Sequence, residues 1–161
     1  MENQEPQMEI IEGETCPICH AKTLTLTETE RDIPFFGPTA LFSMDCSSCG
    51  YHKADIERMQ EGEPAKFVVE INSEEDLKIR IIKSSFATVK LGTLGSIEPG
   101  EAANGYITNV EGVINRLKKQ LEHMRDASDD ATESKKIKNM LKKITKILWG
   151  QEKLKITLED P

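Results

Sequence analysis

The four cysteines of this chain have a spacing that suits metal binding. They form two Cys-x-x-Cys pairs, Cys16 with Cys19 and Cys46 with Cys49. Two thiolates on one tight turn supply one edge of the tetrahedron that zinc prefers, so two pairs complete a four-cysteine site. The 26 residues between the pairs exceed the usual gap of a paired zinc motif. The gap still suits a zinc ribbon, in which each pair lies on its own turn. The sequence therefore predicts one structural zinc ion.

Other interpretations of the cysteine pairs remain open at this point. Two disulfides would need an oxidising compartment, and a redox-active Cys-x-x-Cys would need one pair without a partner pair. His20 and His52 flank the pairs, and either could replace a thiolate, but four cysteines already fill the site. A zinc ion closed by four thiolates has no open position for water. The sequence also contains no Ser-His-Asp set and no HExxH motif, so we expect no enzyme.

Composition and charge narrow the class of protein further. The N-terminal sequence lacks the charged and apolar regions of a signal peptide. No stretch reaches the ~20 apolar residues of a membrane span. We therefore expect a cytoplasmic protein with reduced cysteines. The formal net charge of −7 disfavours a general nucleic-acid binder.

The uneven distribution of charge indicates more than one domain. Residues 1–63 carry 4 basic and 13 acidic side chains, whereas residues 114–161 carry 12 basic and 8 acidic ones. Composition also changes at residues 61–64, where Glu, Gly and Pro follow one another. We predict an acidic N-terminal tail over residues 1–9, a zinc-ribbon module over 10–62 and a β-rich second domain over 63–161.

The zinc-ribbon module is predicted to contain two strands. Residues 22–30 alternate between apolar and polar side chains, and residues 39–45 lead directly into the second cysteine pair. A unit of this size buries too little apolar surface to be stable without help. We expect the metal to supply folding free energy on the order of 10 kcal/mol.

The second domain is predicted to have an α+β fold. Residues 67–71 and 77–81 alternate like the two strands of a hairpin, and 87–91 like a third strand. Two apolar stripes at helical spacing then predict an αα-hairpin over about 109–149. A closing strand follows at 154–158. The predicted class is α+β, a four-cysteine zinc ribbon followed by a β-rich domain with an inserted αα-hairpin.

Details of the helical hairpin can also be predicted. Thr108 and Glu111 match a capping box, with Thr108 as the N-cap and Glu111 at N3. We expect Trp149 to fill the core near the end of the second helix.

Two further segments have both a functional and a structural interpretation. The second predicted helix carries lysines within residues 135–146, which could follow a phosphate backbone but more often form the solvated face of an amphipathic helix. The glycine-containing loop 100–105 precedes a helix, as phosphate-binding loops do. It matches no phosphate-binding motif, and Glu98 and Glu101 would repel a phosphate, so we favour a structural turn.

Phe35 and Phe36 are the candidate partner-binding residues. They lie between the two cysteine pairs in the segment Ile-Pro-Phe-Phe-Gly-Pro at 33–38. Adjacent phenylalanines are costly to expose, so one interpretation packs them into the fold. The other makes them anchors for a protein partner, because aromatic side chains dominate interface energetics. The sequence leaves both interpretations open.

These motifs together resemble the ZPR-type zinc-finger proteins of eukaryotes and archaea. The likeness includes Cys-Pro-Ile-Cys at 16–19, Ile-Pro-Phe-Phe at 33–36 and Cys-Gly-Tyr at 49–51. Three segments of the second domain, at 83–85, 95–100 and 105–112, continue it in order. Eukaryotic members contain two zinc-finger-plus-domain units, and this chain contains one, so it resembles the single-unit archaeal form.

The resemblance implies a function that spacing alone does not. Eukaryotic ZPR-type proteins bind translation elongation factor 1-alpha and assist its folding. The resemblance therefore implies a zinc-dependent, non-enzymatic binding partner or chaperone of that GTPase. The alternative is a zinc-ribbon nucleic-acid or transcription-associated factor that uses the basic helix 135–146.

Overall fold

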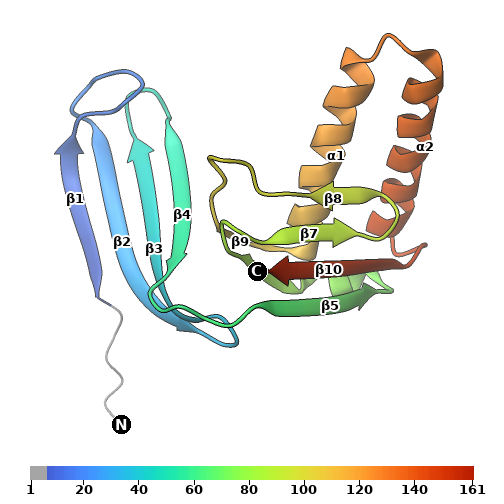
Figure 1. Cartoon of the computed structure of the whole chain (residues 1–161). Coiled ribbons are helices and arrows are strands. Elements are labelled where there is room, and N and C mark those ends of the chain that lie inside the picture. Colours follow the sequence, from blue (N-terminus) through green and yellow to red (C-terminus); the bar gives the residue numbers. More distant parts are fainter. Residues whose placement is uncertain (1–6) are drawn as a thin grey trace. The chain divides into compact units, whose positions relative to one another are not determined.

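Four antiparallel strands form the first part of the structure, a computed structural model that describes residues 7–161 (Figure 1). The strands lie in the sheet in their sequence order. They are β1 (Met8–Glu14), β2 (Leu24–Ile33), β3 (Gly37–Cys46) and β4 (His52–Arg58). The strands predicted at 22–30 and 39–45 are thus confirmed. β2 begins two residues later and ends three residues later than predicted, and β3 extends beyond both predicted ends.

The expected N-terminal tail differs from the structure. Residues 1–6 of the predicted tail lie outside the described residues, and Met8 and Glu9 belong to β1. Met8 pairs with Thr29 of β2, so the backbone of this segment is held by the sheet. Residues 8–12, Met-Glu-Ile-Ile-Glu, do not alternate strictly between apolar and polar side chains, so periodicity did not mark this strand.

Contacts divide the chain into two units. One unit runs to Glu63 and includes Ala102–Tyr106, and the other contains Pro64–Glu101 and Ile107–Pro161. The division after Glu63 lies one residue from the predicted boundary. Residues 102–106 belong to the first unit, whereas the sequence predicted that all residues after 62 belong to the second domain.

The second unit contains a four-stranded sheet and a two-stranded sheet, except that the first residue of β9, Tyr106, is grouped with the first unit. The larger sheet has the order β5-β10-β7-β8, and the smaller pairs β6 with β9. The strand bounds are β5 (Ala65–Ile71), β6 (Arg80–Lys83), β7 (Thr88–Leu91), β8 (Gly95–Ile97), β9 (Tyr106–Asn109) and β10 (Leu154–Asp160). The closing strand therefore lies inside the larger sheet, between β5 and β7.

The predicted hairpin of 67–71 with 77–81 is wrong. β5 pairs with β10 along its whole length, and Leu77 lies in a short 3-10 helix, η1 (Glu74–Lys78). The Asp76 carboxylate accepts the backbone N–H groups of Asn72 at 2.8 Å and Ser73 at 3.2 Å. These bonds turn the chain into η1, so the strand that follows, β6, pairs with β9 instead.

The predicted αα-hairpin is confirmed, but its first cap is not. Helix α1 spans Val110–Ala127 and helix α2 spans Ala131–Leu148. The N-cap of α1 is Asn109, whose Oδ1 accepts the N–H of Gly112 at 2.8 Å, while Thr108 lies in β9. Glu111 consequently occupies N2, and the predicted capping box of Thr108 with Glu111 is wrong.

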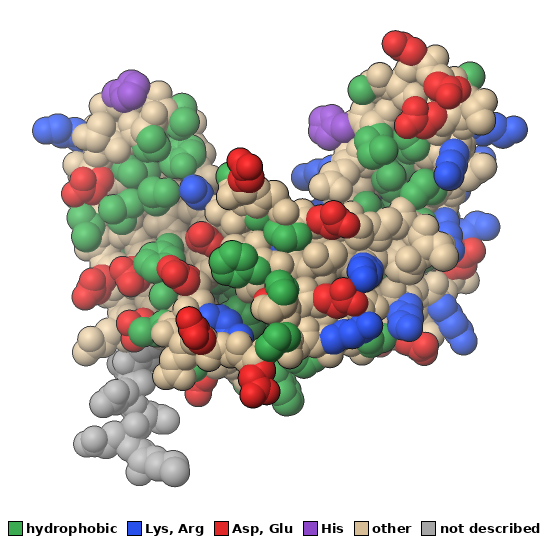
Figure 2. Space-filling model, viewed as in Figure 1, with side chains coloured by type: hydrophobic (Ala, Val, Ile, Leu, Met, Phe, Trp, Pro, Cys, Tyr) green, Lys and Arg blue, Asp and Glu red, His purple; other side chains and the backbone are tan. Residues whose placement is uncertain are grey.

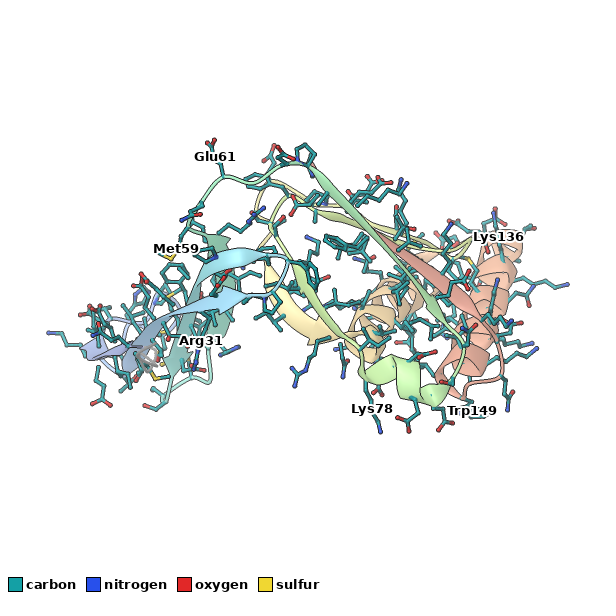
Figure 3. The ribbon with its side chains drawn as sticks, turned by 90° about the horizontal axis from the view of Figure 1, so that it is seen from below. Arg31, Met59, Glu61, Lys78, Lys136 and Trp149 are labelled. Carbon is teal, nitrogen blue, oxygen red and sulfur yellow. The ribbon has the colours of Figure 1, made fainter. Side chains whose placement is uncertain are left out.

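The core of the second unit lies between its strands and helices. Its largest fully buried side chains come from β5, β7, β10 and both helices, and they are Ile71, Val89, Leu91, Val110, Val113, Ile114, Ile144, Ile147 and Ile156. Trp149 is 63% exposed just after α2, so its predicted core position is wrong (Figure 3). It lies beyond the buried stripe that ends at Ile147. No helix within residues 7–161 is long and apolar enough to cross a membrane.

Candidate metal centre

The two cysteine pairs lie on turns with the same backbone hydrogen bonds. In the first turn, the N–H of Cys16 donates to Ala21 O at 2.9 Å, and His20 N–H donates to Cys16 O at 3.0 Å. In the second turn, Cys46 N–H donates to Tyr51 O at 2.8 Å, and Gly50 N–H donates to Cys46 O at 3.0 Å. Each turn therefore presents both of its cysteines from one compact loop, as a zinc knuckle requires.

The sheet brings the two knuckles together. The first knuckle connects β1 to β2, and the second connects β3 to β4. Leu24 at the start of β2 pairs with Cys46 at the end of β3, so both turns lie at the same end of the sheet. A small buried cluster of Cys16, Leu24 and Cys46 supports them.

The four sulfur atoms fit a tetrahedral zinc ion. All four Sγ atoms lie within 4.8 Å of one another. Cys16 Sγ is 3.7 Å from Cys49 Sγ, and Cys19 Sγ is 3.6 Å from Cys46 Sγ. A tetrahedron with Zn–S bonds of about 2.3 Å has edges of about 3.8 Å. The cysteines are free thiols, and both of these contacts run between the knuckles. The chain thus contains a four-cysteine zinc site.

The environments of the thiols explain why the cluster needs a cation. The hydroxyl of Thr23, 3.2 Å from Cys46 Sγ, together with the backbone at Cys49, lowers the Cys46 pKa to about 6. At Cys49 the N–H of Tyr51 lowers the pKa, but burial and the other cysteines outweigh it and raise the pKa to about 12. One thiol therefore keeps its proton beside an ionised neighbour until a metal cation supplies positive charge.

Neither neighbouring histidine belongs to the cluster of ligands. His20 is exposed and adopts a left-handed backbone conformation, with φ at 61°. His52 lies on β4 with its Nδ1 atom 2.6 Å from Asp45 Oδ1. Among the described residues, the four cysteines alone form a group suited to a metal ion. Thr23 was missed from the sequence, because a threonine four residues after a cysteine is not a recognisable signal.

The structure separates the roles of the two phenylalanines. Phe35 is 96% exposed, whereas Phe36 is 8% exposed and has the Arg58 guanidinium 5.2 Å from its ring centroid. Phe36 N–H donates to Ile33 O at 3.0 Å, and Phe35 has a φ of 65°. This is the pattern of a type II turn with proline at its second position, in which the third residue is usually glycine or asparagine. Phe36 therefore packs into the fold, and Phe35 alone is presented to solvent.

The structure also places the two other segments considered from the sequence. Gly105 N–H donates to Asp55 Oδ1 at 2.9 Å, so the end of the 100–105 loop contacts a carboxylate within the first unit. On α2, the apolar stripe of Ile137, Ile144 and Ile147 is buried. Lys136 and most of its neighbouring lysines face solvent, as on any amphipathic helix (Figure 3).

Comparison with known proteins gives matches over both units. The zinc-finger domain of the ZPR1 family matches residues 9–64, and the ZPR1 jelly-roll domain matches residues 75–161. A ZPR1-like protein of Methanocaldococcus jannaschii is 35% identical over 156 residues, which cover 96% of this chain and 79% of that protein. A ZPR1-like protein of Pyrococcus horikoshii is 36% identical over 151 residues, covering 91% of this chain and 68% of the relative.

A more distant relative comes from Schizosaccharomyces pombe. It is named zinc finger chaperone zpr1 and is 25% identical over 134 residues, which cover 80% of this chain. The match covers 28% of that relative. The similarity to the archaeal proteins therefore extends over most of both chains, whereas the yeast protein is much longer than its matching part.

Proposed function

This chain belongs to the ZPR1 family of zinc-finger proteins, and we propose that it is a zinc-dependent binding partner and chaperone of the translation elongation factor 1-alpha GTPase. The resemblance to ZPR-type proteins implies this partner, and the name of the S. pombe relative supports the chaperone role. We further propose that the protein acts in the cytoplasm, where elongation factors work.

The exposed side chain of Phe35 is the observation that carries this proposal. A phenylalanine that is 96% exposed gains nothing from folding, and a left-handed backbone costs about 1 kcal/mol or more for a residue with a Cβ. Backbone strain of this kind is concentrated at functional sites. An aromatic ring that is held outward at a loop tip suits a pocket on a partner protein.

The zinc ion has a structural role in this proposal. Four thiolates fill its coordination sphere, so no position remains for a water nucleophile or a substrate. The metal holds the two knuckles together, and the sheet between them positions the turn that carries Phe35. We therefore propose a binding protein and not an enzyme.

The proposal is tested by titrating the labelled, zinc-loaded chain with elongation factor 1-alpha from its own organism. Phe35→Ala should weaken binding by about 30-fold, which corresponds to about 2 kcal/mol. The matched control is Phe86→Ala, because Phe86 is 72% exposed in the second unit. The control should bind like the wild type, and neither variant should change the melting temperature.

Two outcomes would contradict the proposal. The first is no binding of the wild-type chain in either nucleotide state or during refolding. The second is binding of RNA or DNA that weakens steeply with salt, which would favour the nucleic-acid alternative and α2 as its surface.

A further inference from the structure

One face of the sheet in the first unit carries a row of apolar side chains that are partly exposed to solvent. Ile11 pairs with Leu26, and Leu26 pairs with Met44, so these three side chains lie side by side across β1, β2 and β3. Phe42 lies two residues before Met44 on the same face. Ile11 is 51% exposed and Phe42 is 37% exposed. Leu26 and Met44 are partly buried in this row, whereas Ile11 and Phe42 are accessible to solvent.

Acidic side chains surround this apolar row. Glu9 pairs with Glu28, which pairs with Phe42, and Phe42 pairs with Asp55 of β4. Glu57 lies two residues after Asp55, on the same face of the sheet. Figure 2 shows hydrophobic side chains over these four strands with acidic side chains around them. Within residues 7–161, none of the three glutamates has an ion-pair partner. Several carboxylates close together create a negative potential that favours the approach of a cation.

The same residues line a hollow of about 400 Å³. Its floor contains Ile11, Leu26 and Met44, and its rim contains Glu9, Glu28 and Glu57. Lys53 is the one basic residue of the lining. An apolar surface rimmed by polar groups on a soluble protein marks an interaction site. This apolar row with its glutamate rim is called the acidic groove below.

We propose that the acidic groove binds a basic amphipathic segment of the protein partner, in which large apolar side chains alternate with lysine or arginine. The apolar side chains would be buried against Leu26 and Met44. The cations would lie within reach of Glu9, Glu28 and Glu57. This inference rests on the proposed protein-binding function and adds the chemistry of the segment that is bound.

The charge of the rim selects this occupant over others. A phosphate backbone would meet uncompensated carboxylates, and an acidic peptide would be repelled in the same way. A second copy of the same sheet face would place glutamates against glutamates. A segment with both basic and apolar side chains neutralises the charge of the glutamate rim and also covers the apolar row.

The test uses two labelled nonapeptides with the zinc-loaded, full-length chain. In one peptide leucine alternates with lysine, and in the other leucine alternates with glutamate. Fluorescence anisotropy should show that the lysine peptide binds at least about tenfold more tightly than the glutamate peptide. Added salt should reduce the difference. Equal binding of the two peptides, or no binding of the lysine peptide, would overturn the proposal.

Two variants with matched controls locate the site on this face. Ile11→Ser and Glu28→Lys should each weaken binding of the lysine peptide by about tenfold. Ile10→Ser alters a 57% exposed isoleucine on the opposite face of β1, and Glu61→Lys makes the same charge change outside the groove. Both controls should bind within about twofold of the wild type. Equal loss in the variants and their controls would contradict the proposal.

Binding of elongation factor 1-alpha by the same variants separates the two proposals. If the wild type binds the elongation factor and the groove variants bind it equally well, the groove inference fails and the proposed function stands. If the wild type binds the lysine peptide and not the elongation factor, the proposed partner fails and the acidic groove remains a site for basic segments.

Discussion

His20 and Gly50 occupy the same position in the two zinc knuckles. Each lies four residues after the first cysteine of its pair, and each donates its N–H to the carbonyl of that cysteine at 3.0 Å. Their φ angles are 61° and 76°, both in the left-handed region. The second knuckle uses glycine for this conformation, and the first uses a residue with a side chain.

Substitution at these two positions should have unequal effects. A Cβ at Gly50 would meet nothing within 4 Å, so Gly50→Ala acts through the backbone alone and should destabilise the zinc-bound fold by about 1–2 kcal/mol. His20→Gly relieves a similar strain, but it makes the unfolded chain more flexible by about 0.5–1 kcal/mol. It should therefore be nearly neutral. Urea unfolding at saturating zinc measures both. Equal destabilisation, or loss of zinc from His20→Gly, would contradict this account.

The hydroxyl of Thr23 should tune zinc affinity. Thr23→Val keeps the side-chain shape and removes the group that lies 3.2 Å from Cys46 Sγ. The Cys46 pKa should rise from about 6 towards its ordinary value, so protons compete with zinc at higher pH. We expect about a tenfold loss of zinc affinity at neutral pH and a zinc-release midpoint at higher pH.

Chelator competition across a pH series measures this effect. Thr25→Val is the control, because Thr25 pairs with Asp45 and lies one register step from the knuckle. Identical release curves for the wild type and Thr23→Val would show that the hydroxyl has no influence on the metal.

The cap of α1 should depend on Asn109 and not on Thr108. Asn109→Ala removes the acceptor for the N–H of Gly112 and should cost about 1 kcal/mol of unfolding free energy. Thr108→Ala should cost less, because the Thr108 side chain is not the N-cap acceptor. Thermal or urea unfolding of both variants gives the comparison, and a larger effect of Thr108→Ala would reverse the assignment.

Phe36 should contribute to stability. Its ring is 8% exposed and lies beneath the Arg58 guanidinium, so Phe36→Ala removes a buried ring and a cation–π contact together. We expect a loss of about 3–5 kcal/mol. Phe35→Ala should leave the unfolding midpoint nearly unchanged. If both variants unfold alike, the division of roles between the two rings is wrong.

Patterns local in sequence predicted much of this fold. The spacing of the cysteines specified the zinc site, because each pair needs only one turn to present two ligands. The apolar stripes around Val113 and Ile144 specified the helical hairpin in the same way. These features depend on a few neighbouring residues, and the chain forms them without reference to distant segments.

Features that depend on distant or detailed contacts were not predicted. Alternation marks 67–71 as a strand but does not name its partner, and β10 lies more than 80 residues away in sequence. Asp76 turns the chain into η1 through two backbone bonds that no periodicity shows. The sequence does not distinguish the adjacent phenylalanines at 35 and 36. The turn at 33–36, which contains both, decides which ring is buried.

Refolding of elongation factor 1-alpha tests the central claim most directly. Denatured elongation factor is diluted into buffer with GTP, and the fraction able to bind nucleotide is measured over time. The chain should be added at equimolar concentration in its zinc-loaded form, after zinc removal by a chelator, and as Phe35→Ala. The account predicts that the zinc-loaded wild type raises the refolded yield, and that zinc removal or Phe35→Ala abolishes most of the gain. An unchanged yield with the zinc-loaded wild type would contradict the account.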